Sequence, residues 1–136
     1  MARLAGSSVR ALKARAEAAS GSMVECPFQG YRAPTVSVVI PALNEAANLP
    51  HVLPKIPPWV CEVLLVDGRS TDDTVEVARR LRPGIRIVTQ EGRGKGAALR
   101  TGFASARGDI IVTLDADGST DPGEIPAFVE IGRAHV

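Results

Sequence analysis

Three aspartates follow one apolar run near the end of the chain. In the stretch VTLDADGSTDP, residues 112–122, Asp115, Asp117 and Asp121 lie within seven positions. Such a cluster can be a turn in which Asp side chains accept hydrogen bonds from backbone N–H groups and cap the next helix. It can also bind a divalent cation, because Mg²⁺ and Mn²⁺ prefer carboxylate and phosphate oxygens. We expect Asp115 and Asp117 to bind Mg²⁺ or Mn²⁺ and Asp121 to lead into a helix.

A glycine-rich segment, QEGRGKGAAL, carries two cations at the start of an expected helix. Gly92, Gly94 and Gly96 allow close approach to the backbone, and Arg93 and Lys95 suit a phosphate or a diphosphate. The segment is not a Walker A loop, because no Ser or Thr follows the lysine. A flexible connection with solvated cations remains the alternative.

Two more polar groups stand at the ends of apolar runs. Asp67 could accept a hydrogen bond from a nucleobase, or it could be an acidic residue near a helix cap at Ser70. Asn44 and Glu45 could reach a ribose, or they could start the following helix.

The elements that must position these groups alternate along the chain. Short β-branched runs predict buried strands at 35–40, 60–67, 85–89 and 109–115. Between them, helices are expected over 70–81, with Ser70 and Asp73 in capping-box spacing, and over 94–108. A helix from about Glu45 should be short or kinked, because Pro50 and Pro54 interrupt it.

This order predicts an α/β fold with a mostly parallel sheet and flanking helices. Ligands of open parallel sheets collect beyond the carboxyl ends of the strands. The candidate residues all follow strand ends, so we expect them to face one crevice.

The bulk composition excludes several classes of protein. The 136 residues are 45% hydrophobic and 23% charged, as in a single globular domain. A net charge of +1 predicts no nucleic-acid partner. Cys26 and Cys61 form no disulfide framework, so we expect reduced thiols and a cytoplasmic location.

The two ends of the chain differ from its middle. Residues 1–33 begin with an Ala-, Ser- and Arg-rich stretch, and we expect a poorly ordered or helical leader or an over-long gene start before Met23. The last six residues, IGRAHV, match one reading frame of a common sequencing-library adapter. We therefore expect residues 34–130 to be the folded part and 131–136 to be a non-native tail on a gene truncated at its 3′ end.

Four segments in this order and spacing resemble one enzyme family: SVVIPALNEAANL, EVLLVDGRSTDDT, GRGKGAALRTGF and GDIIVTLDADGSTDP. From about residue 33 to 130 the chain is similar to the N-terminal half of a family 2 glycosyltransferase, in particular to polyprenyl- or dolichyl-phosphate sugar synthases. The resemblance implies a Rossmann-like GT-A fold, incomplete at the C-terminus. It also implies metal-dependent, inverting transfer of a sugar from a UDP- or GDP-sugar to an acceptor such as a polyprenyl phosphate or a glycan. The full-length protein could then associate with the cytoplasmic face of a membrane.

The resemblance also assigns residues. It places Pro41, Ala42 and Glu45 against the nucleoside, Asp67 on the base, Lys95 near the donor, and Asp115 and Asp117 in the family's Asp-x-Asp motif. The chain reads Val66-Asp67-Gly68-Arg69-Ser70 where the family usually has Val-Asp-Asp-Gly-Ser, so the choice between uracil and guanine stays open. The catalytic base and the acceptor-binding half are expected beyond Val136.

Three alternatives stay open. A haloacid-dehalogenase-like phosphatase would use Asp115 as nucleophile, but its motif usually follows the first strand. A sugar-nucleotide pyrophosphorylase would carry its glycine-rich loop after the first strand, where this chain has PALNEAAN. The chain could also be a non-catalytic fragment that only binds nucleotide.

Overall fold

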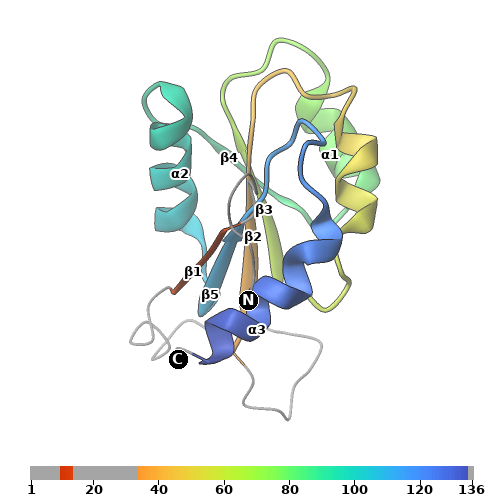
Figure 1. Ribbon diagram of the computed structural model, residues 1–136. Coiled ribbons are helices and arrows are strands. Elements are labelled where there is room, and N and C mark those ends of the chain that lie inside the picture. The colour runs from red at the N-terminus through yellow and green to blue at the C-terminus, as the bar shows by residue number, and fades with distance from the viewer. Residues whose placement is uncertain (1–9, 14–33, 135–136) are drawn as a thin grey trace.

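The computed structural model describes residues 10–13 and 34–134 of the chain. Its centre is a sheet in the order β1-β5-β2-β3-β4 (Figure 1). The strands are β1 (Arg10–Lys13), β2 (Val36–Ala42), β3 (Glu62–Asp67), β4 (Arg86–Thr89) and β5 (Ile110–Thr113). Strands β5, β2, β3 and β4 run parallel, which confirms the predicted α/β class with a mostly parallel sheet.

Both faces of the sheet are covered, as the nearly continuous apolar strands predict. Successive residues of a strand point to opposite faces. Val39 of β2 packs with Ala98 and Ala106 beneath helix α2 (Gly94–Ser105), whereas Val38 and Ile40 belong to a second core cluster on the other face. Figure 1 shows α2 on one side of the sheet and helix α1 (Thr74–Leu81) on the other.

The connection after β2 contains no α-helix. It forms two 3₁₀ turns, η1 (Leu49–His51) and η2 (Leu53–Lys55), each with a proline in its first two positions. Proline has no N–H to donate and clashes with the preceding turn, so neither piece can extend. The predicted short or kinked helix from Glu45 is therefore replaced by two shorter turns.

The last described elements are η3 (Pro122–Glu124) and, directly after it, helix α3 (Ile125–Ala134). Asp121 is the N-cap of η3, and its Oδ1 accepts a hydrogen bond from the backbone N–H of Gly123 at 2.8 Å. This confirms the prediction that Asp121 leads into a helix. Helix α3 continues past residue 130, and the boundary expected there stays a prediction.

Three further expectations from the sequence are wrong. Residues 10–13 are neither helical nor irregular but form β1, which pairs antiparallel with β5 from Arg10↔Thr113 to Lys13↔Ile110. The free edge of β5 explains this, because its unpaired N–H and C=O groups can accept another strand. The rest of the expected leader lies outside the described residues.

The capping box at Ser70 and Asp73 does not form. Helix α1 begins at Thr74, its N-cap Asp73 makes no side-chain cap hydrogen bond, and Ser70 Oγ accepts instead from the backbone N–H of Asn44. Cys61 is disulfide-bonded and not a reduced thiol, since spacing alone cannot show which cysteines the fold brings together. Cys26 lies outside the described residues.

None of the helices among the described residues has the length and apolar character required to cross a bilayer.

Candidate functional site

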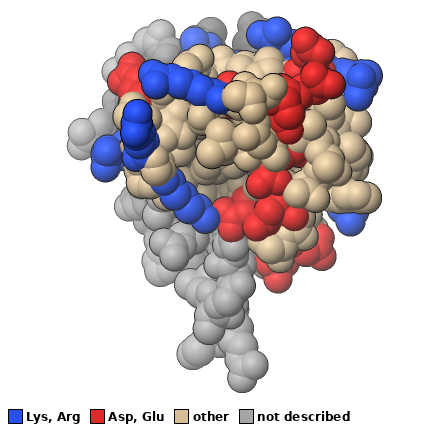
Figure 2. All heavy atoms as spheres, turned by 90° about the horizontal axis from the view of Figure 1, so that it is seen from above, with Lys and Arg blue, Asp and Glu red and all other residues tan. Residues whose placement is uncertain are grey.

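A cavity of about 660 Å³ lies beyond the carboxyl ends of β2, β3, β4 and β5. Figure 2 looks down on this edge of the sheet and shows basic side chains mainly on its left and acidic ones mainly right of centre. The lining residues come from the ends of the strands, the four segments that follow them and the start of α2: Pro41, Ala42, Leu43, Glu45, Gly68, Arg69, Gln90, Gly92, Arg93, Gly94, Lys95, Ala98, Asp115, Ala116 and Asp117. The structure thus brings most of the predicted site residues to one crevice.

Lys95 and Asp115 form an ion pair across this cavity. Lys95 stands in the first turn of α2 and Asp115 follows the buried Leu114 after β5. Lys95 Nζ lies 2.8 Å from Asp115 Oδ1, and the two side chains are 64% and 18% exposed. The geometry joins a candidate phosphate-binding cation to a candidate metal ligand, two groups that sequence spacing could not show to be in contact.

Asp117 lies two residues beyond Asp115, and the intervening Ala116 is buried. Its Oδ1 accepts a hydrogen bond from the backbone N–H of Ser119 at 2.8 Å. Hydrogen bonding from the Ser119 side chain and backbone lowers the pKa of Asp117, with a smaller contribution from the charge of Lys95. Asp117 therefore keeps its negative charge at neutral pH.

Asp115 and Asp117 fit a hard divalent cation that shares its ligands with a substrate. Among the described residues no group of three or more His, Cys, Asp or Glu side chains is placed to hold a metal. Mg²⁺ commonly uses one or two carboxylates and completes its shell with water and substrate phosphate. The two carboxylates at an open cavity match that pattern, and they do not match an all-protein cage.

The glycine loop before α2 is held by a side chain that we did not predict. Gln90 Nε2 donates to the carbonyl oxygens of Gly92 at 3.3 Å and Gly94 at 3.0 Å. Both glycines have a left-handed backbone, with φ of 83° and 86°, which residues with a Cβ rarely adopt. In this structure, therefore, side-chain hydrogen bonds and left-handed glycines define the shape of the loop.

Asn44 does not line the cavity. Its Oδ1 accepts from the backbone N–H of Thr71 at 2.8 Å and of Asp72 at 3.3 Å, and its own N–H donates to Ser70 Oγ at 2.9 Å. In this structure Asn44 joins the loop after β2 to the loop after β3. Its predicted contact with a ribose has no support from this geometry.

Asp67 also lies outside the cavity lining, and Gly68 and Arg69 line it instead. Asp67 Oδ1 accepts from the backbone N–H of Ser70 at 3.1 Å, which is the structural role that we considered as its alternative. Glu45 does line the cavity, and its Oε2 accepts from Asn48 Nδ2 at 2.7 Å.

The segments expected at this crevice, 41–45, 90–96 and 115–121, include Leu43, Gln90 and Ala116, which line the cavity without having been given a role. Sequence reasoning missed Gly68, Arg69 and Ala98 as lining residues. One signal was available, because the Gly68-Arg69 pair is where the chain departs from the motif of the family that it resembles. Ala98 shows no sequence feature that would have predicted its place at the cavity.

Comparison with known proteins places this architecture in a family. A model of glycosyl transferase family 2 matches residues 37–134. An uncharacterized glycosyltransferase of Mycobacterium tuberculosis is 44% identical over 94 residues, which cover 69% of this chain and 42% of the relative. An undecaprenyl-phosphate 4-deoxy-4-formamido-L-arabinose transferase of Pseudomonas aeruginosa is 39% identical over 106 residues. These residues cover 70% of this chain and 31% of the relative.

Solved structures agree with this placement. Glucosyl-3-phosphoglycerate synthase of Mycobacterium tuberculosis, crystallised with Mn²⁺, UDP-glucose and phosphoglyceric acid, superposes with a TM-score of 0.62 at 38% identity. The match covers 68% of this chain and 37% of the synthase. The chain thus spans less than half the length of these relatives. Its sheet is the Rossmann-like half of a GT-A fold, and the chain belongs to glycosyl transferase family 2.

Proposed function

We propose that this protein transfers a sugar from a nucleoside-diphosphate sugar to an acceptor, and that the described residues form its donor site. The observation that carries the proposal is the cavity in which Asp115, Asp117 and Lys95 meet the glycine loop at the start of α2. Two carboxylates and a cation beside free helix N–H groups suit a metal-bound diphosphate.

In this proposal Asp115 and Asp117 hold Mg²⁺ or Mn²⁺ as the Asp-x-Asp motif of the family. The metal would neutralise the diphosphate and so stabilise it as a leaving group. Arg93, at the N-cap of α2, and Lys95, in the first turn of that helix, supply further positive charge. Pro41, Ala42 and Glu45 line the part of the cavity after β2 and form one wall of the nucleoside subsite.

The reaction would invert the configuration of the sugar. An acceptor oxygen forms a bond to the anomeric carbon while the bond from that carbon to the diphosphate breaks, and the acceptor proton passes to a base. We place that base and the acceptor-binding residues outside the described part of the chain.

The relatives suggest which donor and acceptor to test first. The similar synthase was crystallised with UDP-glucose and phosphoglyceric acid, and another relative is named for transfer involving undecaprenyl phosphate. We therefore propose a UDP-sugar donor, with a GDP-sugar as the second choice, and an acceptor that carries a phosphate. If that acceptor is a polyprenyl phosphate, the full-length protein would work at the cytoplasmic face of a membrane.

Titration of the chain with UDP-glucose and GDP-mannose in Mn²⁺, beside a transfer assay with phosphoglycerate and undecaprenyl phosphate, tests this proposal. Metal-dependent binding of one donor supports the donor site, and transfer supports the complete reaction. Binding without transfer would favour the non-catalytic fragment. Phosphatase activity that Asp115→Asn abolishes, without donor binding, would favour the phosphatase alternative and overturn the proposal.

A further inference from the structure

Arg69 has a backbone conformation that arginine rarely adopts. Its φ is 65°, in the left-handed region, and Asn44 is the other non-glycine residue with positive φ in the described chain. This conformation is unfavourable for a side chain with a Cβ, whereas glycine adopts it readily. Non-glycine residues in such conformations cluster at functional sites, where the surrounding structure holds them in place.

The loop around Arg69 is held on both sides by hydrogen bonds. The backbone N–H of Gly68 donates to the carbonyl of Ala42 at 2.8 Å, and that of Ser70 donates to Asp67 Oδ1 at 3.1 Å. Beyond Ser70, the Asn44 side chain accepts from two further backbone N–H groups of the same loop. These bonds fix the backbone on either side of Arg69 and so fix the point from which its side chain extends.

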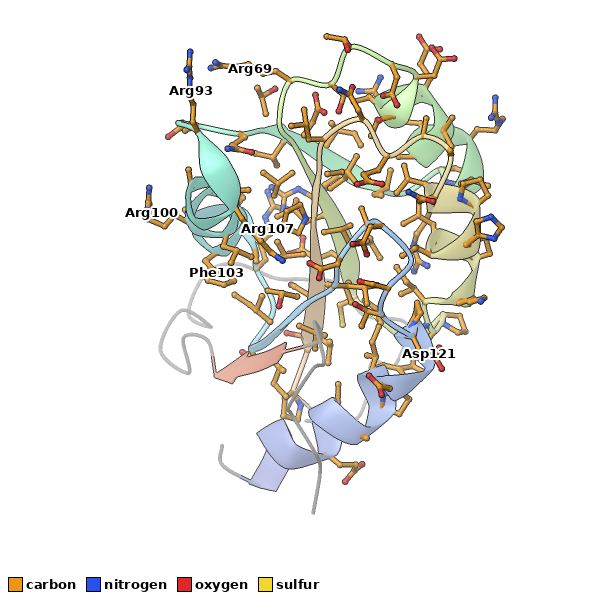
Figure 3. The ribbon with its side chains drawn as sticks, turned by 45° about the horizontal axis from the view of Figure 1, so that its top comes forward. Arg69, Arg93, Arg100, Phe103, Arg107 and Asp121 are labelled. Atoms are coloured by element: carbon orange, nitrogen blue, oxygen red, sulfur yellow. The ribbon has the colours of Figure 1, made fainter. Side chains whose placement is uncertain are left out.

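The Arg69 side chain is exposed and lines the cavity. Within residues 10–13 and 34–134, no hydrogen bond or ion pair involves its guanidinium. Figure 3 shows it extending from its loop along the same edge of the sheet as Arg93. The Arg69 guanidinium is therefore a positive charge at the cavity that pairs with no other residue in the described chain.

The charges of the cavity indicate what this cation binds. Six charged side chains line it, three of each sign: Arg69, Arg93 and Lys95, and Glu45, Asp115 and Asp117. A divalent metal and a sugar-linked diphosphate, which carries roughly two negative charges, also balance each other, and the bound ion must be counted with the protein groups. With Arg69 the occupied donor site is neutral, and without it one negative charge is left over.

We propose that the Arg69 guanidinium binds the diphosphate of the donor and so contributes to donor affinity from the β3–α1 loop. This inference rests on the proposed function, because it requires a nucleoside diphosphate in the cavity. A planar guanidinium can donate two parallel hydrogen bonds to phosphate oxygens, which a lysine ammonium cannot reproduce. The unfavourable backbone of Arg69 is then retained for binding and not for folding.

Calorimetric titration of the 136-residue chain with UDP, GDP and uridine, in saturating Mn²⁺, tests the proposal. The variants are Arg69→Gly and Arg69→Asn, which remove the charge and tolerate a left-handed backbone, and Arg69→Lys, which keeps the charge. Arg100→Gln is the matched control, because Arg100 is an exposed arginine of α2 that does not line the cavity. Thermal melting is measured on the same samples.

We expect UDP to bind about tenfold more weakly to Arg69→Gly and Arg69→Asn, and about threefold more weakly to Arg69→Lys, with uridine unchanged. Arg69→Gly should also melt at a higher temperature than the wild type, so that stability and affinity move in opposite directions. Unchanged UDP affinity in both charge-removing variants would overturn the role of Arg69 while leaving the donor site intact. A wild-type chain that binds neither UDP nor GDP in Mn²⁺ would instead overturn the proposed function.

Discussion

Lys95 Nζ lies 2.8 Å from Asp115 Oδ1, so an ammonium group contacts the carboxylate that we assign to the metal. The lysine side chain is 64% exposed, and water and salt therefore weaken this attraction. A divalent cation carries twice the charge and can displace the ammonium. Once displaced, Lys95 is free to contact a phosphate in the same cavity.

Lys95→Met should separate the pairing of Lys95 with Asp115 from its contact with a phosphate, because methionine keeps much of the apolar stem and removes the charge. Without the competing ammonium, Asp115 should bind Mn²⁺ alone at least as tightly as in the wild type. UDP in saturating Mn²⁺ should bind about three- to tenfold more weakly, as expected for loss of one partly screened cation. Titrations with Mn²⁺ and then with UDP measure both effects. Weaker binding of Mn²⁺ to Lys95→Met in the absence of UDP would contradict the claim that the Lys95 ammonium competes with the metal for Asp115.

Gly102 sets the distance between α2 and the sheet. A Cβ at this position would overlap Val39 Cγ1 and lie 3.2 Å from Val66 Cγ2. Gly102→Ala should therefore destabilise the protein by about 1–3 kcal/mol through overpacking, despite the better helix propensity of alanine. Urea unfolding monitored by circular dichroism gives this value.

Gly96 provides the matched control in the same helix. A Cβ there meets only Arg100 Nη1, at 3.9 Å. Gly96→Ala should leave the free energy of unfolding unchanged or raise it by up to about 1 kcal/mol, from helix propensity alone. Equal effects of the two substitutions would mean that α2 does not pack on the sheet as closely as the structure shows.

Asp72 should make the stability of the loops around the cavity depend on pH. Hydrogen bonds from the Thr74 hydroxyl and then from the backbone N–H groups of Thr74 and Ala46 lower its pKa below the ordinary value of 3.8. A carboxylate with a depressed pKa stabilises the fold fully above its unfolded pKa and loses that contribution as the pH falls through the lower, folded pKa.

Asp72→Asn imitates the protonated carboxyl and should lower the melting temperature at pH 7. The difference in melting temperature between Asp72→Asn and the wild type should shrink to zero as the pH falls below 3.8 and through the folded pKa of Asp72. Asp73→Asn is the control, because the neighbouring Asp73 is exposed and its side chain caps no N–H group. A gap between Asp72→Asn and the wild type that persists at low pH would show that charge is not the cause.

The fold could be predicted because its signal is local. The strands are short β-branched runs, and the parallel order follows from the crossover connections between them, most of which contain a helix. Asp115, Asp117 and Lys95 were found because polar groups at strand ends face one edge of a parallel sheet. The metal-ligand and phosphate assignments themselves stay predictions.

Other parts of the site depend on contacts between distant segments. Asn44 and Asp67 have the right residue types for a ligand, but their side chains hold the loop at 70–72. The bonds of Asn44 join segments about 27 residues apart, and no spacing rule reveals them. The departure from the family motif at Gly68-Arg69 marks Arg69 as unusual, but its left-handed backbone and its place at the cavity are visible only in the structure.

The central claim is that Asp117 belongs to a metal site that binds a nucleoside diphosphate. Titration of UDP into the chain tests it most directly, in Mn²⁺ and after removal of Mn²⁺ with EDTA, for the wild type, Asp117→Ala and Asp121→Ala. Asp121 is the matched control, because it belongs to the same acidic stretch but caps η3. We predict saturable binding that requires Mn²⁺, is lost in Asp117→Ala and is kept in Asp121→Ala. The same UDP affinity with and without Mn²⁺, and in Asp117→Ala, would contradict the account.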